Sequence, residues 1–197
     1  AYKPQAYDPF VDSTLEKVTQ GHQASRMNIE EMFAAVLSPE IVISKIFYLY
    51  GRSAANGKSS ILNMIQETFN ENGQNIAAVT PQKLATDKFA AASIQNKLAV
   101  INDDLPSSKI EDSGVLKSIV TSGWIEIERK GQQSETIKAN VCFISASNHL
   151  PDFSESGNSI NRRLHIIPFE YSFLQDRDRK SDLETQTLIK SESAKEY

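Results

Sequence analysis

The chain has 197 residues, of which 40% are hydrophobic and 23% are charged, and its formal net charge at pH 7 is −4. This length predicts one α/β domain with a small appendage, and the mildly acidic balance excludes a protein that coats nucleic acid over its whole surface. The chain has a single cysteine, and it has no apolar run near the roughly 20 residues that are needed to span a bilayer. We therefore expect a cytoplasmic protein with no membrane partner.

Residues 1–44 predict a small helical segment. Residues 1–10 contain two prolines and are expected to be extended. Between residues 11 and 38, apolar side chains recur at helical spacing, which predicts two short helices joined near Gly21.

Residues 45–170 predict the core of the domain. Short apolar runs indicate buried strands, and longer periodic stretches indicate helices. The expected strands are 46–50, 76–79, 98–101, 141–145 and 164–167. The expected helices are 61–69 and 113–121, and Gly73 is expected to be the C-cap glycine of the first of them. A β-hairpin is expected over 124–138, with its turn at 130–132. This order predicts a mainly parallel sheet with helices on both faces.

The last part of the chain, residues 171–197, is interpreted as a truncated extension. Residues 191–197 follow a helix-like pattern without a stop signal, and the sequence begins with Ala1 rather than methionine. We therefore expect the sequence to be a fragment of a longer protein.

A phosphate-binding loop is predicted between the first strand and the first core helix, formed by Asn56, Gly57, Lys58, Ser59 and Ser60. In such a loop, backbone N–H groups and the helix N-terminus surround a phosphate. We expect Lys58 to bridge the β- and γ-phosphates of ATP, Ser59 to bind Mg²⁺, and Gly57 to let the backbone approach without a Cβ clash. The alternative is a turn that opens a helix by chance.

The loop departs from the usual spacing by one residue. Five residues, 52–56, separate Gly51 from Gly57, where four are usual. Either the loop is one residue longer, or Arg52 occupies the place of the first glycine.

Two carboxylates, Asp103 and Asp104, follow the strand expected at 98–101. At a strand end beside a phosphate loop, one carboxylate of such a pair holds Mg²⁺ through water, and the other accepts a proton from the attacking water or orients it. We assign Asp103 to the metal and Asp104 to the water, with the reverse order open. The alternative is a solvated turn, since Asp and Pro106 are common turn residues.

Two further polar groups are ambiguous when they are considered locally. Asn148 ends an apolar strand, where its amide could reach the γ-phosphate, yet a turn residue before Pro151 is the favoured local interpretation. Arg162 and Arg163 precede the last strand. Tandem arginines usually form a solvated face, but one presented to a neighbour's phosphates would act as an arginine finger.

The order of these pieces resembles the superfamily-three helicases, most closely the phage and plasmid primase-helicases related to the satellite-phage and poxvirus enzymes. The resemblance covers residues 11–169. It rests on YGRSAANGKSS at 50–60, KLAVINDD at 97–104, LKSIVTSG at 116–123, ERKG at 128–131, SASNHLP at 145–151 and NRRLHIIPF at 161–169.

The resemblance implies an AAA+-like P-loop ATPase core that acts as a ring, usually a hexamer, with ATP and Mg²⁺ between subunits. Asn148 would be the first sensor, and Arg163 or Arg162 would be the finger that reaches the adjacent ATP. Arg129 and Lys130 on the hairpin would contact the DNA backbone in the central channel, where a motor grips phosphates because they are uniform along the strand. Without the resemblance, an ordinary exposed hairpin tip would be the favoured interpretation.

A protein of this kind would translocate 3′ to 5′ on single-stranded DNA and unwind duplex DNA. Its parent chain would carry a primase domain, and it would act in the bacterial host cytoplasm if it is encoded by a phage or plasmid. Two other functions fit the phosphate loop and the acidic pair. One is a different P-loop enzyme such as a small-molecule kinase, although the sequence has no clear arginine-rich lid. The other is an initiator or loader that binds ATP only as a switch, for which the lengthened loop leaves room.

Overall fold

The computed structural model describes residues 6–38, 40–110, 112–121, 123–154 and 158–174, so most of the extension expected after residue 170 lies outside the described residues. At the centre is a five-stranded sheet in which every pairing is parallel and the strand order is β2-β3-β6-β1-β7. The strands are β1 (Ile46–Tyr50), β2 (Ile76–Ala77), β3 (Ala99–Asn102), β6 (Cys142–Ser147) and β7 (Leu164–Pro168). The predicted α/β class with a mainly parallel sheet is confirmed.

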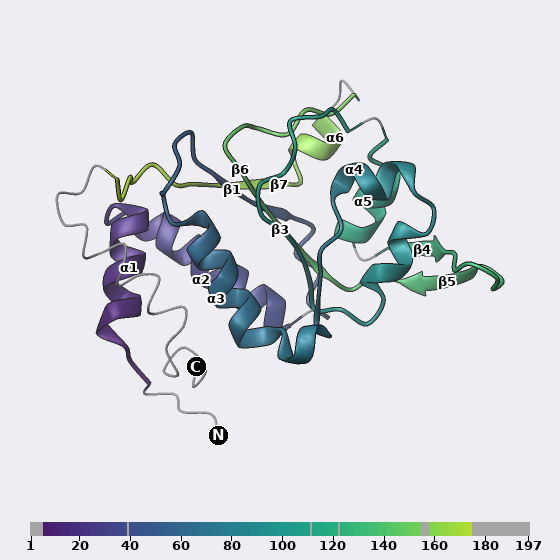
Figure 1. The fold of residues 1–197 in the computed structure, drawn as a ribbon, viewed down its shortest axis with the longest axis horizontal. Helices are drawn as coiled ribbons and strands as arrows, with labels where there is room; N and C mark the ends of the chain where they lie inside the picture. The colour runs from purple at the N-terminus through teal and green to yellow at the C-terminus, as the bar shows by residue number, and fades with distance from the viewer. Residues whose placement is uncertain (1–5, 39, 111, 122, 155–157, 175–197) are drawn as a thin grey trace.

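Helices cover both faces of this sheet (Figure 1). One face carries α1 (Pro9–Thr19), α2 (Gln23–Leu37) and α3 (Lys58–Phe69). The other face carries α4 (Pro81–Thr86), the 3-10 helix η2 (Ala90–Ile94), α5 (Gly114–Val120) and the hairpin of β4 (Trp124–Ile127) and β5 (Glu135–Lys138). The short α6 (Asn158–Asn161) precedes β7.

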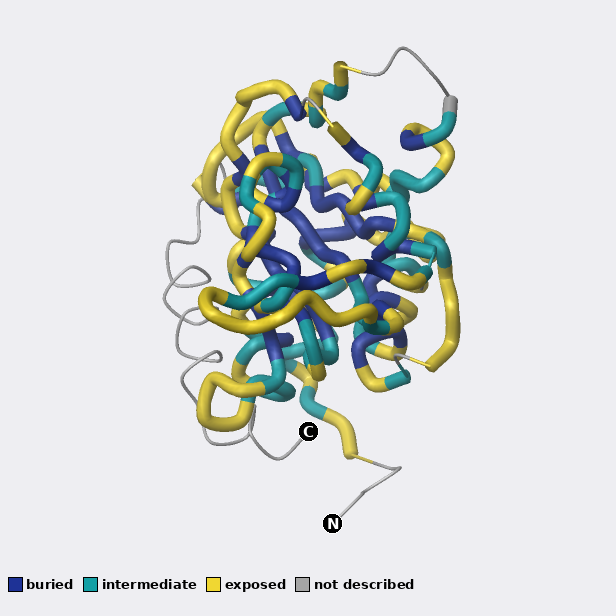
Figure 2. The backbone as a smooth tube through the Cα atoms, turned by 90° about the vertical axis from the view of Figure 1, so that its right-hand side faces the viewer, coloured by how far each residue is buried: buried dark blue, intermediate teal, exposed yellow. Residues whose placement is uncertain are grey.

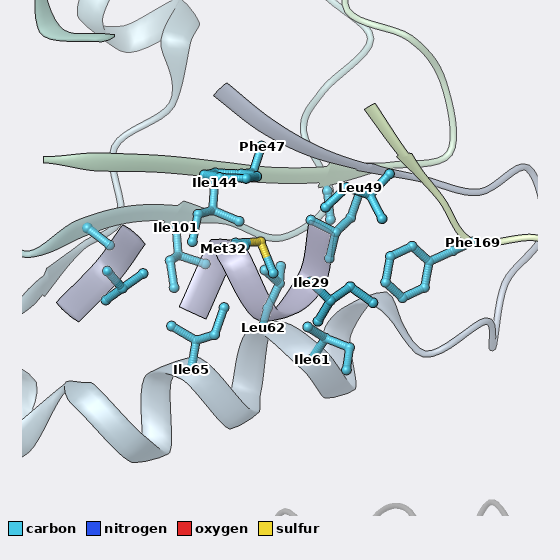
Figure 3. Packing of buried hydrophobic residues seen from close by; sticks show 14 of the residues in the cluster. Ile29, Met32, Phe47, Leu49, Ile61, Leu62, Ile65, Ile101, Ile144 and Phe169 are labelled. Atoms are coloured by element: carbon cyan, nitrogen blue, oxygen red, sulfur yellow. The ribbon is translucent and has the colours of Figure 1, made fainter. Parts of the chain in front are cut away.

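Strand β1 shows why the sheet is buried on both faces. Its first four residues are all buried, and successive side chains enter different cores, as the pleat requires. Phe47 and Leu49 pack with α2 and α3, whose side chains Met32 and Leu62 point toward the sheet (Figure 3). Ile46 belongs to the opposite core. In Figure 2 the dark blue, buried stretches of the chain gather in the interior of the molecule, and the yellow, exposed stretches lie around them.

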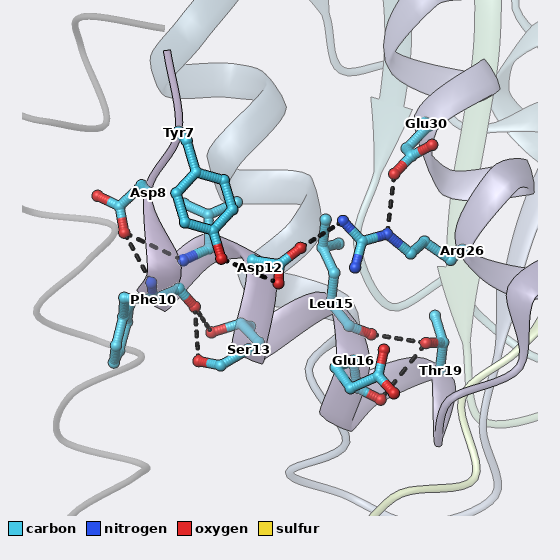
Figure 4. Close-up of polar contacts among 12 residues, drawn as sticks. Tyr7, Asp8, Phe10, Asp12, Ser13, Leu15, Glu16, Thr19, Arg26 and Glu30 are labelled. Atoms are coloured by element: carbon cyan, nitrogen blue, oxygen red, sulfur yellow. Dashed lines mark hydrogen bonds and ion pairs between the residues drawn. The ribbon is translucent and has the colours of Figure 1, made fainter. Parts of the chain in front are cut away.

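The two N-terminal helices share a hydrophobic core with the sheet, since Val18 of α1 and Ile29 of α2 are buried in the same cluster as β1. Asp8 caps α1 by accepting hydrogen bonds from Phe10 N at 2.8 Å and Val11 N at 3.3 Å (Figure 4). The expectation that residues 1–10 are extended is therefore wrong at residues 9 and 10. Asp8 followed by Pro9 is a helix-start signal that sequence reasoning overlooked.

The helices α1 and α2 are joined near Gly21, as predicted, where Gln20 and Gly21 both have positive φ. Arg26 of α2 links the two helices through an ion pair with Asp12 of α1 at 2.5 Å, and it also pairs with Glu30 at 3.0 Å (Figure 4).

Two predicted boundaries in the core need correction. Helix α3 ends at Phe69 with Asn70 as its C-cap, so Gly73 is not the cap and lies instead in a 3-10 turn, η1 (Glu71–Gly73). The second strand stops at Ala77 rather than Val79, because Thr80 caps the unpredicted helix α4 by accepting a hydrogen bond from Lys83 N at 3.2 Å.

The hairpin expected over residues 124–138 is present as a separate two-stranded antiparallel sheet. It projects from the body on the side opposite α1 (Figure 1). Within the described part of the chain, no helix has the length and apolar character that crossing a membrane requires.

Candidate functional site

The strand order creates a pocket at one edge of the sheet. Strand β6 lies between β3 and β1, and all three are parallel, so the loops that follow them meet at the carboxyl edge. A cavity of about 310 Å³ lies there. Its lining combines the phosphate loop, the acidic pair and the residues after β6: Ala54, Ala55, Asn56, Gly57, Lys58, Ser59, Ser60, Asp103, Asp104, Ser147 and Asn148.

Lys58 is the buried cation of this pocket, with 7% of its surface exposed. Its Nζ donates to Gly51 O at 3.3 Å, Asn56 Oδ1 at 2.9 Å and Asn148 Oδ1 at 2.8 Å. All three acceptors are neutral oxygens. The structure therefore fixes the position of the ammonium group without neutralising its charge.

Burial lowers the pKa of Lys58 below its usual value, and the nearby carboxylates of Asp103 and Asp104 oppose that shift. Among the described residues, Lys58 forms no ion pair with a carboxylate. A buried cation that has only neutral partners gains most from an anionic ligand, which is the chemistry that a nucleotide phosphate offers.

The phosphate loop is shaped by the side chain of Asn56, which is 2% exposed. Its Nδ2 donates to Ser53 O at 2.9 Å and to Phe169 O at 3.2 Å. A Cβ on Gly51 would collide with that amide and with Phe169 O, so this position needs glycine. Arg52 is exposed and donates to Tyr50 Oη at 3.2 Å. The loop is therefore one residue longer than usual, and Asn56 fills its interior.

Gly57 needs to be glycine for a reason that differs from the expected one. Its φ is 89°, in the left-handed region, and a Cβ would lie 2.6 Å from Cγ1 of Val18 on α1. The crowded side of this residue thus faces α1. Ser59 and Ser60 occupy the first turn of α3, where Ser59 is exposed and Ser60 is half-buried.

The acidic pair is exposed, but the residues on either side of it are anchored. Asn102 Nδ2 donates to Val79 O at 3.0 Å, and Leu105 N donates to Ala146 O at 3.0 Å. Asp104 has a φ of 58°, a conformation that aspartate tolerates better than most residues. These anchors hold both carboxylates at the pocket.

The donor set of the pocket fits Mg²⁺. This ion keeps several waters and usually takes one or two carboxylates together with substrate phosphates, rather than a cage of protein ligands. Asp103 and the Ser59 hydroxyl offer such a partial set at the pocket. The described residues contain no cluster of three or more His, Cys, Asp or Glu side chains that could hold a metal ion.

Asn148 is brought into the pocket by a fixed turn after β6. Tyr48 Oη, from β1, donates to His149 O at 2.8 Å, and Ser147 Oγ lies 3.0 Å from His149 Nδ1. The exposed Asn148 amide between these anchors accepts the hydrogen bond from Lys58. Local sequence had favoured a plain turn residue, whereas the structure places this amide beside the phosphate loop.

The two arginines lie at the opposite edge of the sheet. Lys45 Nζ donates to Arg162 O at 2.7 Å, and Ile46 N donates to Arg163 O at 2.7 Å, so both arginines sit beside the amino end of β1. Arg163 is half-buried and donates to Ser159 O. Arg162 is exposed, and its guanidinium makes no hydrogen bond or ion pair with the described residues. Neither arginine lines the pocket of its own chain.

The hairpin residues also lie outside the pocket. Arg129 is half-buried, pairs with Glu135 at 2.5 Å and donates to Gln95. Lys130 is exposed in the turn, where Gln132 N donates to Arg129 O at 3.1 Å. Of the two predicted DNA contacts, Lys130 is free within the described structure and Arg129 is engaged.

Solved structures with a similar fold include the C-terminal region of NrS-1 and the JCV helicase. The NrS-1 region has a TM-score of 0.72 at 16% identity, over 96% of this chain and 45% of that one. The JCV helicase has a TM-score of 0.58 at 14% identity, over 94% of this chain and 51% of that one. The chain therefore has a helicase-like fold and spans about half the length of these structures.

The chain belongs to a family of unknown function, DUF5906, whose model matches residues 49–163. That range starts near the end of β1 and includes the phosphate loop, the acidic pair, the hairpin, Asn148 and both arginines. No curated protein matches the chain.

Proposed function

We propose that this chain is the ATP-hydrolysing motor core of a DNA helicase of the superfamily-three type, from a phage or another mobile element. The observation that supports this most directly is the single pocket in which Lys58, the acidic pair and Asn148 meet from three neighbouring strands. A buried cation, exposed carboxylates and a fixed amide are together the groups that phosphoryl transfer requires.

Each group has a role that follows from its setting. Lys58 would bind the β- and γ-phosphates, because its ammonium is fixed but not neutralised. Asp104 would orient the attacking water and accept its proton, while Asn148 would hold the γ-phosphate end of the pocket. Asp103 and Ser59 would hold Mg²⁺, which when bound neutralises charge that develops on the phosphates.

The placement of the arginines supports a site that is shared between subunits. Arg162 and Arg163 lie at the amino edge of the sheet and the pocket lies at its carboxyl edge, so they could serve only the ATP of another copy. We propose that full-length subunits form a ring, most simply a hexamer. The hairpins, with Arg129 and Lys130, would face single-stranded DNA in its channel, and the parent chain would carry a primase domain.

The test is ATP turnover by the full-length protein, with and without single-stranded DNA. Turnover that DNA stimulates and that Lys58→Ala reduces to background would support the proposal. The matched control is Lys97→Ala, which removes a lysine that bonds to Gln74 O just before β3, away from the pocket, and should change little.

Two outcomes would contradict the motor. Turnover that is indifferent to DNA would favour another P-loop enzyme, such as a kinase. ATP binding without turnover, in a sample that sedimentation shows to be assembled, would favour an initiator or loader that uses ATP as a switch.

A further inference from the structure

The outer face of the β4–β5 hairpin presents an indole ring next to a lysine. Trp124 is 69% exposed, whereas Ile125 and Ile127 on the inner face are only 6% and 0% exposed. Lys138 lies directly opposite Trp124 in the antiparallel register and is exposed. Residues directly opposite each other in such a pair share one face of the sheet, with Cβ atoms about 5 Å apart. The face therefore combines a flat aromatic surface with a cation.

This face is held rigidly by the opposite side of the hairpin. Ile125 and Ile127 belong to the core that α5 and the sheet form, so the hairpin is anchored along β4. At its base, Ala139 N donates to Gly123 O at 3.0 Å, which closes the two strands beside Trp124. The ring is thus presented from a fixed surface rather than from a free loop.

The charge that remains on the hairpin favours an anionic partner. Two of its carboxylates are neutralised by cations: Glu128 by Lys88 at 2.6 Å, and Glu135 by Arg129 at 2.5 Å. Lys130 and Lys138 keep exposed ammonium groups with no hydrogen bond or ion pair to the described part of the chain.

One opposing charge remains on the same face. Glu126 is exposed on β4 opposite Thr136, and it too forms no ion pair with the described residues. The hairpin itself carries equal numbers of cations and carboxylates, but because Lys88 from outside it pairs with Glu128, the charges left unpaired among the described residues are two lysines against one carboxylate. The local balance is therefore positive although the whole chain has a net charge of −4.

We propose that Trp124 is a stacking platform for a base of single-stranded DNA, with Lys138 beside it and Lys130 at the tip contacting phosphates. Aromatic rings beside a positive track are how proteins bind single strands without sequence preference, because every base has a π-face. In duplex DNA those faces are already stacked, so the platform selects the single strand. The inference rests on the proposed DNA motor and extends its contact surface from the hairpin tip to the hairpin base.

The composition of the chain provides a direct test, because Trp124 is its only tryptophan. We would titrate the 197-residue chain with oligodeoxythymidylate and follow tryptophan fluorescence, while anisotropy of a labelled copy of the same oligonucleotide reports binding independently. Stacking predicts that fluorescence is quenched in parallel with the rise in anisotropy.

Substitutions separate stacking from charge. Trp124→Ala should weaken binding roughly 5- to 100-fold without changing its salt dependence, and Trp124→Phe should recover part of the loss. Lys138→Ala should lower the slope of log affinity against log salt by about 0.7, as expected for one lost phosphate contact on a single strand. Thr136→Ala, on the same face, is the matched control and should leave both quantities unchanged.

Three results would overturn the inference. Binding seen by anisotropy without quenching would show that DNA binds the chain without stacking on Trp124, and the proposed motor would stand. A fluorescence shift that depends on protein concentration and not on DNA would show that the ring packs against a second copy. No binding by either signal would remove the DNA contact of this hairpin, whereas the proposed function would still be decided separately by DNA-stimulated ATP turnover of the full-length protein.

Discussion

The buried cation of the pocket and the cations on the surface are held in different ways. Lys58 is fixed by three neutral oxygens of its own chain, so its position is set before any ligand arrives. Outside the pocket, each pair of neighbouring cations combines one that is engaged and one that has no partner among the described residues. Arg163 bonds to Ser159 O beside the unpartnered Arg162, and Arg129 pairs with Glu135 beside the unpartnered Lys130.

The difference indicates what each region is suited to bind. A buried, prepositioned charge favours one anion in one geometry, because little reorganisation is needed when that anion binds. A cation that has no partner among the described residues and follows or precedes an anchored neighbour is held at a defined position with its charged group exposed, which suits a partner that arrives from outside the chain.

The largest expected effect on ATP turnover is at the arginine pair, where the exposed Arg162 can be compared with the engaged Arg163. If Arg162 is the proposed finger, Arg162→Ala in the assembled full-length protein should reduce ATP turnover by roughly 10³-fold or more and leave ATP binding intact. Phosphate release and nucleotide titration would measure the two quantities.

Subunit mixing provides the control for the arginine prediction. Assemblies that combine Lys58→Ala chains with Arg162→Ala chains should recover part of the turnover, because some interfaces then carry both intact residues. If Arg163→Ala, rather than Arg162→Ala, removes turnover while binding persists, the free arginine is not the finger. If Arg162→Ala abolishes ATP binding, the residue is structural.

A smaller loss of ATP affinity is expected when a hydrogen bond that positions Lys58 is removed. Asn56→Ala removes one of its acceptors, and a hydrogen bond to a charged group contributes about 1.5–3 kcal/mol, so ATP affinity should fall roughly 10- to 100-fold. Gly51→Ala should have a similar effect with Asn56 intact, since its Cβ would displace the same amide.

Calorimetric titration of ATP, with a double-mutant cycle, tests whether Asn56 acts through Lys58. In a Lys58→Ala background, Asn56→Ala should cost little further affinity. Additive losses would instead indicate that Asn56 supports the general shape of the loop, and unfolding curves of each variant would measure that contribution.

The smallest effect compares the two cations at the hairpin tip. Lys130→Ala should weaken binding to single-stranded DNA a few-fold and lower the slope of log affinity against log salt by about 0.7, because one contact between a cation and a phosphate is lost. Arg129→Ala should change the slope less, since its charge is already paired with Glu135. Anisotropy titrations over a range of salt concentrations measure both, and equal slopes for the two variants would contradict the distinction.

Sequence patterns were sufficient where local chemistry determines structure. The strand at 46–50, the loop and the following helix are adjacent in sequence, so periodicity and glycine placement located them. Helix α4 was missed although Thr80 and Pro81 signal a helix start, because its six residues are too few to show a period.

Other features depended on contacts between distant segments. Trp124, Ile125 and Ile127 are all apolar in the sequence, and only the packing of the hairpin shows that Trp124 is exposed while both isoleucines are buried. Likewise, the inward turn of Asn56 depends on the carbonyl of Phe169, which no local pattern reveals.

That last contact also affects how the protein is made. The amide of Asn56 and the carbonyl of Phe169 are 113 positions apart, and Phe173 N donates to Ala55 O at 2.9 Å from a similar distance along the chain. During translation the residues of the loop leave the ribosome long before β7 is synthesised, and contacts of such separation form late. A nascent chain therefore carries the loop's sequence without its shape, and we expect it to gain affinity for nucleotide only once β7 has emerged and docked against β1.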